Sequence, residues 1–584
     1  MKLPKIPLAQ TVIKLCELKG IKHIVISPGS RNAPLIIGFT NHPFFKCYSI
    51  VDERCAGFFA LGIAQQTQEP VALVCTSGSA LLNYFPAVAE AHYSNIPLVV
   101  LSADRPEYLV GIGDGQTIDQ KNVYGNHCIC HANLKEDIYP EKLSKPNEPK
   151  ILKNLENKLE KFLGIQESIQ NQNVALINQA LNTAALKKGP VHINIPFSEP
   201  LYEAIEEFTV SPEHIAVKKV INELDELTLK MLSEQWNAAS KKMILIGVNY
   251  PDQIEPHWFD ELAKDTSIIV FTETTSNVHH ESFFSSIDKI IAPLDESEFE
   301  ELQPEILLTF GGMIVSKKIK AFLRKYKPDQ HWHVGENAAN DTFFCLNKHL
   351  NTNINLFLSQ FCPLLKAPQS NYHGHWNSVK LKRNQKHEAY LKTIDHSDLK
   401  VYDKVLRSIP DNCLFQVGNS TAIRYLQLFD LNPTLKVFCN RGTSGIDGST
   451  STAIGAAVTT NEQTLFITGD LSFFYDSNAL WNNYIPNNFR IILINNGGGG
   501  IFRILPGHKQ TKNFDTFLET KHHLNAQHLC DMFQISYQKA TDKDQLENAL
   551  SNFYSESEKP KLLEIVTPSE LSATVLLNYF NYIK

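Results

Sequence analysis

Short apolar runs rich in β-branched residues recur along this chain, and each is followed by a turn and a segment with helical spacing. Before residue 190 they occur at 21–27, 46–51, 70–75 and 97–102, with helical stretches such as 53–66 and 80–93 between them. A strand that is apolar on both faces must be covered on both. These runs therefore predict a parallel sheet with helices on each side.

The same pattern returns twice, as expected for a chain of 584 residues, which is too long for one core. We expect three α/β domains with parallel sheets at 1–190, 205–365 and 400–584, and a polar linker at 366–399. A charged stretch at about 133–172 interrupts the first domain ahead of its strand at 189–197. The later strands are expected at 243–247, 267–273, 305–311, 331–335, 413–418, 435–439, 463–469, 489–495 and 560–566.

Composition narrows the class of protein. Hydrophobic residues make up 43% of the chain and charged residues 20%, as in soluble globular proteins. The net charge of −7, without a long basic tract, argues against nucleic acid and anionic membranes as partners. No apolar run approaches the roughly 20 residues of a membrane span, and residues 1–20 have an amphipathic helical pattern unlike a signal peptide. We therefore expect a cytoplasmic enzyme whose eleven scattered cysteines are reduced.

Residues 127–131, with the sequence HCICH, form a cluster of candidate metal ligands. Zinc sites use a two-residue gap between cysteines and a second, distant ligand pair, and this cluster has neither. Alternation along a strand also places neighbouring side chains on opposite faces. We therefore assign no metal to His127, Cys128, Cys130 and His131, and leave their role open.

Glycine, serine, asparagine and charged residues gather at the ends of the expected strands. Ligands of open α/β sheets bind at the carboxyl ends of strands, so these residues mark the candidate site. In the first domain they form SPGSR (27–31), DER (52–54), TSGSA (76–80) and ADRP (103–106), and in the third GNS (418–420), NRGTSGIDG (440–448), GDLS (469–472) and NNGGGG (495–500).

Two of these motifs predict a metal site in the third domain. Asp470 precedes Asn496 by 26 positions, which is one strand–helix–strand unit, so adjacent parallel strands bring them together. A carboxylate, an amide oxygen and a backbone carbonyl, here that of Gly498, suit a magnesium ion that also binds phosphate oxygens. A Gly-Asp pair followed by Asn-Asn at this distance is typical of enzymes that use thiamine diphosphate. Ordinary turn chemistry is the alternative explanation.

Glu53, at the end of the second strand, is the carboxylate that such an enzyme needs in its other domain. A glutamate that hydrogen-bonds the aminopyrimidine ring activates thiamine diphosphate. Its alternative role is a favourable charge at a helix N-terminus. Asp52 is the better cap, so capping alone does not explain Glu53.

These motifs, with GQTIDQ (115–120), VGNSTAIR (417–424) and the continuation of NNGGGG into IF and LP, resemble the 2-succinyl-5-enolpyruvyl-6-hydroxy-3-cyclohexene-1-carboxylate synthase family of menaquinone biosynthesis. They occur in the family's order and cover essentially the whole chain. The resemblance implies a thiamine diphosphate-binding fold with pyrimidine-binding, central and diphosphate-binding domains. It implies a transferase that uses thiamine diphosphate and Mg²⁺ or Mn²⁺, decarboxylates 2-oxoglutarate and adds the succinyl unit to isochorismate in a 1,4 sense.

The resemblance also assigns roles to single positions. Both substrates are dicarboxylates, which arginines can grip through two hydrogen bonds. Lys318 stands where relatives often carry arginine, so its role stays open. The implied cofactor contacts are Thr76, Ser77, Gly78, Ser420, Ile446, Gly469, Asp470, Leu471, Ser472, Asn496, Gly498, Gly499 and Ile501. The implied substrate contacts are Ser30, Arg31, Arg105, Gln116, Lys317, Arg424, Arg441, Phe502 and Leu505.

The family's architecture implies a homodimer or a dimer of dimers with active sites at the subunit interface. The nearest alternative is another thiamine diphosphate-dependent enzyme, either a 2-oxo acid decarboxylase or an acetohydroxyacid synthase-like carboligase. A nicotinamide oxidoreductase fits poorly, because GGGGIF lacks the G-x-G-x-x-G order. The choice between Mg²⁺ and Mn²⁺, and regulation by a later pathway product, stay open.

Overall fold

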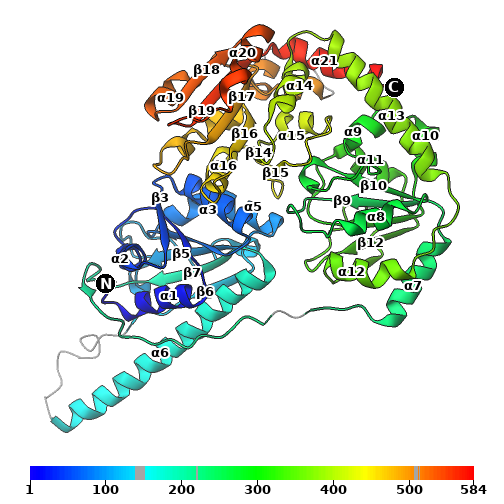
Figure 1. Cartoon of the computed structure of the whole chain (residues 1–584). Coiled ribbons are helices and arrows are strands. Elements are labelled where there is room, and N and C mark those ends of the chain that lie inside the picture. The colour runs from blue at the N-terminus through cyan, green and yellow to red at the C-terminus, as the bar shows by residue number, and fades with distance from the viewer. Residues whose placement is uncertain (138–151, 219–220, 506–510, 512) are drawn as a thin grey trace. The chain divides into compact units, whose positions relative to one another are not determined.

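The structure is a computed structural model that describes residues 1–137, 152–218, 221–505, 511 and 513–584, with only the backbone of 152–163. In these residues the strands form three parallel sheets and one short antiparallel pair (Figure 1). The chain divides into two compact units. The first comprises Met1–Lys219, Thr450–Thr460 and Asp476–Ile485, and the second Val220–Ser449, Asn461–Tyr475 and Pro486–Lys584. The expected class, several α/β domains built on parallel sheets, is confirmed.

The first unit contains a parallel sheet whose two faces are both covered by helices. Helices α1 (Pro7–Leu18), α2 (Ala33–Asn41) and α6 (Leu152–Lys187) share one core with it. Helix α3 (Glu53–Thr67) packs on other side chains of β2, β4 and β5, and α5 (Phe85–Ser94) packs on α3. The strand order is β3 (Lys46–Ser49), β2 (His23–Ile26), β4 (Val71–Cys75), β5 (Leu98–Asp104), β7 (Val191–Pro196) and β6 (Cys130–Asn133). Strand β1 (Leu3–Pro4) pairs antiparallel with β8 (Ala204–Ile205).

The single helix expected at 80–93 is divided into α4 (Ala80–Asn83) and α5. Pro86 lies in the first turn of α5. Proline has no N–H to donate and its ring clashes with the carbonyl four residues earlier, so a continuous helix is excluded there.

The second unit contains two further parallel sheets. The central one has the order β10 (Ile268–Thr272), β9 (Lys242–Ile246), β11 (Ile306–Phe310), β12 (Gln330–Val334) and β13 (Lys348–Leu350). One of its faces packs on α7 (Glu226–Ala238), α8 (His257–Ala263) and α12 (Ile354–Phe361) around Trp236 and Trp332. The other packs on α9 (Ile287–Ile291), α10 (Glu296–Leu302) and α11 (Lys317–Lys325).

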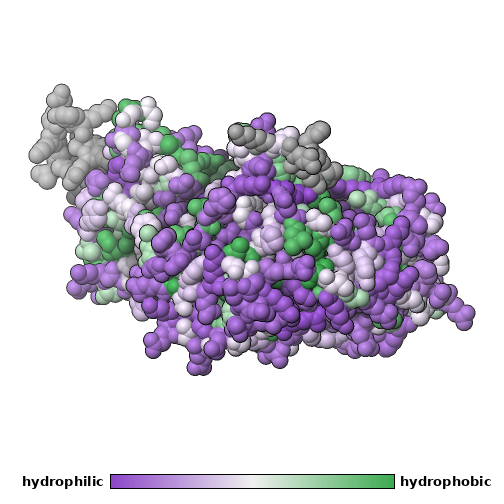
Figure 2. All heavy atoms as spheres, turned by 90° about the horizontal axis from the view of Figure 1, so that it is seen from above, coloured by the Kyte–Doolittle hydropathy of each residue, from purple (hydrophilic) through white to green (hydrophobic). Residues whose placement is uncertain are grey.

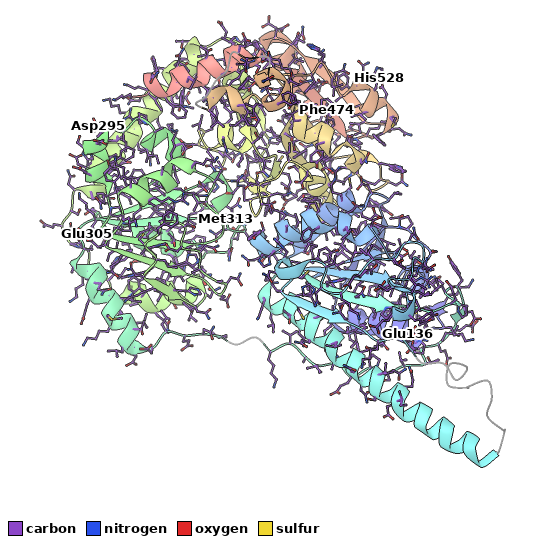
Figure 3. All side chains as sticks on the ribbon, turned by 180° about the vertical axis from the view of Figure 1, so that it is seen from behind. Glu136, Asp295, Glu305, Met313, Phe474 and His528 are labelled. Carbon is purple, nitrogen blue, oxygen red and sulfur yellow. The ribbon has the colours of Figure 1, made fainter. Side chains whose placement is uncertain are left out.

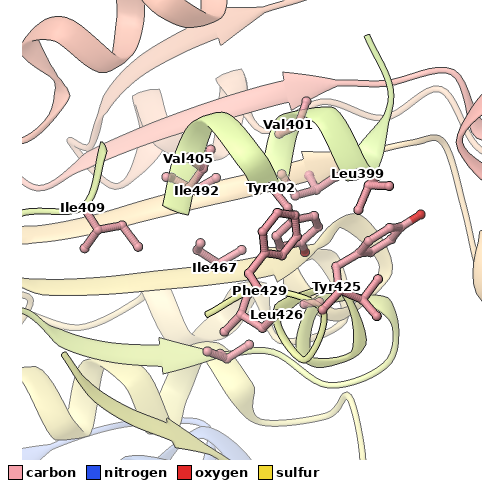
Figure 4. Close-up of a cluster of buried hydrophobic side chains, with 14 of the residues drawn as sticks. Leu399, Val401, Tyr402, Val405, Ile409, Tyr425, Leu426, Phe429, Ile467 and Ile492 are labelled. Carbon is pink, nitrogen blue, oxygen red and sulfur yellow. The ribbon is translucent and has the colours of Figure 1, made fainter. Parts of the chain in front are cut away.

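The third sheet carries the Gly-Asp and Asn-Asn motifs. Its order is β15 (Lys436–Cys439), β14 (Leu414–Val417), β16 (Thr464–Gly469), β17 (Phe489–Asn495), β19 (Lys561–Val566) and β18 (Ser536–Ala540). Figure 4 shows its core against α14 (Asp398–Ser408) and α15 (Thr421–Leu426), where the rings of Tyr402 and Tyr425 stack with centroids 4.9 Å apart. Helices α20 (Lys543–Phe553) and α21 (Ser569–Tyr582) add to this core.

The segment expected as a polar linker, 366–399, contains a helix, α13 (Tyr372–Thr393). It buries Tyr372 and Trp376 against the central sheet and Tyr390 and Leu391 in the core of the third. Helix α13 of the linker therefore packs against both sheets of the second unit. The domain boundaries at 190, 205, 365 and 400 stay predictions.

Each parallel sheet has a point where the chain reverses its direction of strand addition: between β2 and β4, between β9 and β11, and between β14 and β16. Such points are the usual ligand sites of α/β sheets. In the central sheet this point is filled by backbone, because a Cβ built on Gly247 would lie 2.1 Å from the carbonyl oxygen of Gly312. The sequence motifs lie at the other two points.

The surface drawn in Figure 2 is mostly hydrophilic, with small hydrophobic patches between polar residues. Within the described ranges, none of the helices has both the length and the apolar character that crossing a membrane requires.

Candidate active site

The carboxyl edge of the first sheet brings together three of the expected motifs. The Arg31 N–H donates to Thr76 Oγ1 at 3.3 Å, and Ser77 Oγ donates to the Gln116 carbonyl at 3.0 Å. A Cβ on Gly29 would lie 2.3 Å from Thr76, so only glycine permits this approach. Ser30 lies in the same turn with its side chain exposed.

Two of the arginines expected to contact substrate, Arg31 and Arg105, already have partners within the first unit. Arg31 is 4% exposed, donates to the Phe197 carbonyl at 3.0 Å and lies 3.3 Å from Glu199, while its Nε is buried without a partner. Arg105 donates to the Gly115 carbonyl at 3.1 Å. Gln116 is exposed, with a φ of 55°, a left-handed conformation uncommon for a residue with a side chain.

Glu53 is the first residue of α3, and the Asp52 side chain caps this helix by accepting from the N–H groups of Arg54 and Cys55. The expectation that Asp52 is the cap is confirmed, and within the part of the chain that the structure describes the Glu53 carboxylate accepts a hydrogen bond from Asn83 Nδ2 at 3.3 Å. Asn478 Nδ2 donates to Asp52 Oδ2 at 2.9 Å. These contacts hold the helix end on both sides of Glu53.

Asp476 supports the same helix end from a fully buried position. It accepts from the Ser451 N–H at 2.7 Å, from Ser451 Oγ at 2.9 Å and from Cys55 Sγ at 3.6 Å. Arg54 lies 3.7 Å away. Burial raises the pKa of Asp476 to about 7.

At the carboxyl edge of the third sheet, Asp470 begins α17 (Asp470–Tyr475) directly after β16. Its Oδ2 accepts from the N–H groups of Gly497 and Gly498 at 2.9 and 3.0 Å, which joins the Gly-Asp motif to the glycine run. His522 Nε2 lies 3.3 Å from the same oxygen, without hydrogen-bond geometry. The ring of Phe474, labelled in Figure 3, packs on His522 at 5.5 Å.

Asn496 presents an amide oxygen that has no partner. Its Nδ2 donates to Asp398 Oδ2 at 3.0 Å, while its buried Oδ1 accepts no hydrogen bond from any residue that the structure describes. The Gly498 carbonyl accepts one hydrogen bond, from the Gly500 N–H, and retains a lone pair. A carboxylate, a free amide oxygen and a carbonyl form a hard-oxygen donor set, so these residues fit a magnesium-type ion.

Residues 519–522 lie against the glycine run and leave no room for a side chain at Gly498. A Cβ on Gly498, whose φ is 148°, would lie 2.6 Å from the Glu519 carbonyl oxygen. The Gly499 N–H donates to that oxygen, and the His522 N–H donates to the Gly497 carbonyl. Glu519 is held in turn by a two-pronged ion pair with Arg503. The close approach that requires glycine in this run is therefore to residues 519–522.

Cationic side chains gather in the second unit from β15, α15 and α11. Arg441 Nη1 donates to Asn419 Oδ1 at 2.7 Å and its Nε is buried without a partner. Burial lowers the pKa of Arg424, and the positive charge of Arg441 lowers it further. The two guanidinium groups therefore face a shared region. The half-buried Lys320 also lies within the influence of Arg441. Lys317 is exposed at the start of α11, and Lys318 Nζ lies 5.2 Å from the Phe580 ring.

Ser420, in the GNS turn, has a φ of 67° and a ψ of −123°, a strained conformation for a residue with a side chain. Ser472 Oγ donates to the Ile446 carbonyl at 3.2 Å, which links GDLS to GIDG. Gly469 has open space where a side chain would point, and Leu471 is half-buried. Ile501 and Phe502 are half-buried and Leu505 is 39% exposed, at α18 (Ile501–Ile504) and just after it.

The HCICH cluster lies away from these motifs, on β6 and the short turn before it. His131 Nε2 hydrogen-bonds the Gly125 carbonyl at 2.9 Å, and His127 packs on Phe85 and Tyr93. Among the residues that the structure describes, no group of three or more His, Cys, Asp or Glu side chains is placed to hold a metal.

Several residues at these motifs carried no sequence signal. Asp398 and His522 lie far from the motifs in sequence and are joined to Asn496 and Asp470 only by folding. Lys320, one turn after the expected Lys317, has its pKa lowered by burial and also by the charge of Arg441. The sequence does not show that Lys320 is half-buried, because its burial depends on the tertiary structure.

Comparison with known proteins agrees with this geometry. Residues 6–123 match the model of the family described as thiamine pyrophosphate enzyme, N-terminal TPP binding domain. The chain is 53% identical, over 100% of both chains, to a protein of Christiangramia forsetii named 2-succinyl-5-enolpyruvyl-6-hydroxy-3-cyclohexene-1-carboxylate synthase. Proteins of that name from Flavobacterium johnsoniae (53% identity, 99% of each chain) and Porphyromonas gingivalis (38%, 98% of this chain and 96% of the relative) are also similar.

The fold and these similarities define a thiamine diphosphate-dependent enzyme. The chain belongs to the 2-succinyl-5-enolpyruvyl-6-hydroxy-3-cyclohexene-1-carboxylate synthase family. The resemblance seen in the sequence motifs is thereby confirmed.

Proposed function

We propose that this protein uses thiamine diphosphate to decarboxylate 2-oxoglutarate and adds the succinyl unit to isochorismate, giving 2-succinyl-5-enolpyruvyl-6-hydroxy-3-cyclohexene-1-carboxylate and CO₂ in menaquinone biosynthesis. The observation that carries the proposal is the placement of Arg424 and Arg441 at the same carboxyl sheet edge as Asp470 and Asn496. Full-length similarity to proteins of that name favours this reaction over other carboligases.

The metal proposal rests on oxygen donors. Asp470, Asn496 and the Gly498 carbonyl hold Mg²⁺ or Mn²⁺, and the ion neutralises the diphosphate. Two observations support it: the unpartnered Asn496 Oδ1 and the hydrogen bonds that tie Asp470 to the glycine run. The remaining cofactor contacts are Thr76, Ser77, Gly78, Ser420, Ile446, Gly469, Leu471, Ser472, Gly499 and Ile501.

Glu53 exchanges a proton with the aminopyrimidine ring. When bound, thiamine diphosphate supplies a carbon nucleophile and an electron sink for the loss of CO₂. Glu53 is suited to this role because Asp52 performs the capping of α3 and the Glu53 carboxylate is left to accept from Asn83. Asp476 and Asn478 keep the helix end in place.

Cationic side chains bind the carboxylates of both substrates. Arg424, Arg441 and Lys317 serve 2-oxoglutarate, and Ser30, Arg31, Arg105 and Gln116 serve isochorismate. Among the described residues Arg441 keeps a buried Nε without an acceptor, and a substrate carboxylate would relieve the repulsion between Arg441 and Arg424. Phe502 and Leu505 supply the apolar contacts of the substrate.

The active enzyme is a homodimer or a dimer of dimers in the cytoplasm. Glu53 belongs to the first unit and Asp470 to the second, and Glu53 of one copy serves the cofactor held by Asp470 of another copy. This arrangement follows the family's architecture.

The test is substrate dependence. Purified protein releases CO₂ from 2-oxoglutarate only with thiamine diphosphate and Mg²⁺, and consumes isochorismate in equal amount. Pyruvate is the control substrate, since it lacks the second carboxylate that Arg424 and Arg441 bind. Equal use of pyruvate, with isochorismate left unchanged, would contradict the proposal.

A further inference from the structure

The two ends of the Asn496 side chain are held differently. Its Nδ2 donates to Asp398 Oδ2 at 3.0 Å, and its Oδ1 is buried without a partner. An asparagine amide carries donors at one end and an acceptor at the other. A carboxylate is an acceptor, so Asp398 takes the NH₂ end and leaves the oxygen facing away.

Asp398 is itself fixed by three elements. It is the first residue of α14 and is 3% exposed. Thr567, which follows β19, donates from Oγ1 to Asp398 Oδ1 at 2.5 Å, and the Asp398 N–H donates to Ser572 Oγ of α21 at 3.0 Å. Rotation of the carboxylate away from Asn496 would break the Thr567 hydrogen bond, while the Ser572 contact fixes the backbone of Asp398.

We propose that Asp398 is a positioning residue for the metal ion, holding Asn496 so that its amide oxygen, and not its NH₂ group, faces the ion. Hard cations bind amide oxygens and are repelled by the N–H donors of a reversed amide. Partners that orient a ligand in this way typically change metal affinity 10–100-fold when they are removed. This inference rests on the proposed metal site at Asp470, Asn496 and Gly498.

The test measures Mn²⁺ binding to the full-length protein with thiamine diphosphate present, from the electron paramagnetic resonance signal of free Mn²⁺. Asp398→Asn can donate to Asn496 as well as accept from it, so it permits the reversed amide. We expect its Kd for Mn²⁺ to rise about 10–100-fold. Asp403→Asn is the matched control, because Asp403 is a buried carboxylate of the same helix that pairs with Arg407 at 2.6 Å. Its Kd should equal that of the unmodified protein.

A swapped pair separates orientation from packing. In the double variant Asp398→Asn with Asn496→Asp, the new amide at position 398 donates its NH₂ to the new carboxylate at position 496, whose other oxygen faces the ion. We expect the double variant to recover Mn²⁺ binding to within a few-fold of the unmodified protein. A purely structural role of Asp398 predicts no recovery.

The outcomes distinguish this inference from the proposed metal site. Unchanged Mn²⁺ affinity in Asp398→Asn, with binding lost in Asp470→Asn, overturns the role of Asp398 and leaves the metal site intact. Unchanged affinity in Asp470→Asn overturns the metal site and this inference with it. If Asp398→Asn does not fold, a folded double variant that binds Mn²⁺ weakly overturns the inference.

Discussion

Glu273 is fully buried at the end of β10, and each of its carboxylate oxygens accepts one N–H at 2.7 Å, from Val315 and Ser316. These N–H groups immediately precede α11, the helix of Lys317 and Lys320. Burial raises the pKa of Glu273 to about 7, opposed by the two N–H groups and by the charge of Arg441. A single side chain thus joins the central sheet to the cationic region.

Replacing Glu273 tests its buried charge. Burial makes the folded protein hold this proton more tightly than the unfolded chain, where a glutamate pKa is about 4.3. This contribution to the free energy of unfolding is fully present below about pH 4.3. As the pH rises to about 7 it is lost, which lowers the free energy of unfolding by up to about 3–4 kcal/mol. As the pH rises from 5 to 7, the free energy of unfolding of the unmodified protein should therefore decrease relative to that of Glu273→Gln.

The measurement is urea unfolding of both proteins at several pH values. The charged groups acting on Glu273 are Asp288, Arg441 and Lys320, and they are unchanged in the variant. A constant difference between the two proteins across this range would show that Glu273 does not titrate there.

Glu53→Gln tests the proposed proton exchange. The variant retains the size and polarity of the side chain but cannot accept a proton, so turnover should fall by at least about 100-fold. Thiamine diphosphate binding, measured by calorimetry, should stay within a few-fold because the metal site is unaffected. Full activity in Glu53→Gln would exclude the role of Glu53.

At the scale of elements, α3 and α16 (Ser449–Ala457) approach each other through glycine in the first unit. A Cβ on Gly62 would lie 2.1 Å from the Thr452 carbonyl oxygen, and a Cβ on Gly455 would lie 2.0 Å from the Phe59 carbonyl oxygen. These contacts are to backbone, which cannot rotate away as a side chain can. The helix that begins with Glu53 is therefore packed along its length as well as held at its end.

Gly455→Ala should lower the free energy of unfolding by about 1–3 kcal/mol, because the added methyl forces the two helix backbones apart. Gly164→Ala in α6 is the control, since no atom lies within 4 Å of its added methyl. Alanine there should stabilise the helix by up to about 1 kcal/mol. Equal effects of the two substitutions in chemical unfolding would refute the close contact.

For the whole molecule, the proposed function assigns Glu53 of the first unit and Asp470 of the second to one cofactor bound by two copies of the chain. Co-expression of Glu53→Gln with Asp470→Asn tests whether two copies share each site. Each variant alone should be inactive, whereas mixed dimers contain one intact site, so the mixture should recover roughly a quarter of normal activity. Recovery is measured as CO₂ release, and a mixture as inactive as either variant would place each site within a single copy.

The sequence by itself determined the three parallel sheets and the motifs at their carboxyl ends. Central strands are apolar on both faces, and turns after them need glycine or small polar residues, so both leave a local pattern. Glu53, Asp470 and Asn496 were found in this way. The metal role predicted for Asp470 and Asn496 follows from their spacing and oxygen ligands, and the roles of the substrate-binding residues follow from the family resemblance.

Only the tertiary structure decided which residues support these motifs. Strands β6, β13 and β18 were missed because they lie at sheet edges, where half-exposed strands lose the continuous apolar pattern. Asp398, Glu273 and His522 are brought to their partners from distant parts of the chain. Their contacts depend on how helices and sheets pack, and such long-range packing leaves no periodic signal in a single sequence.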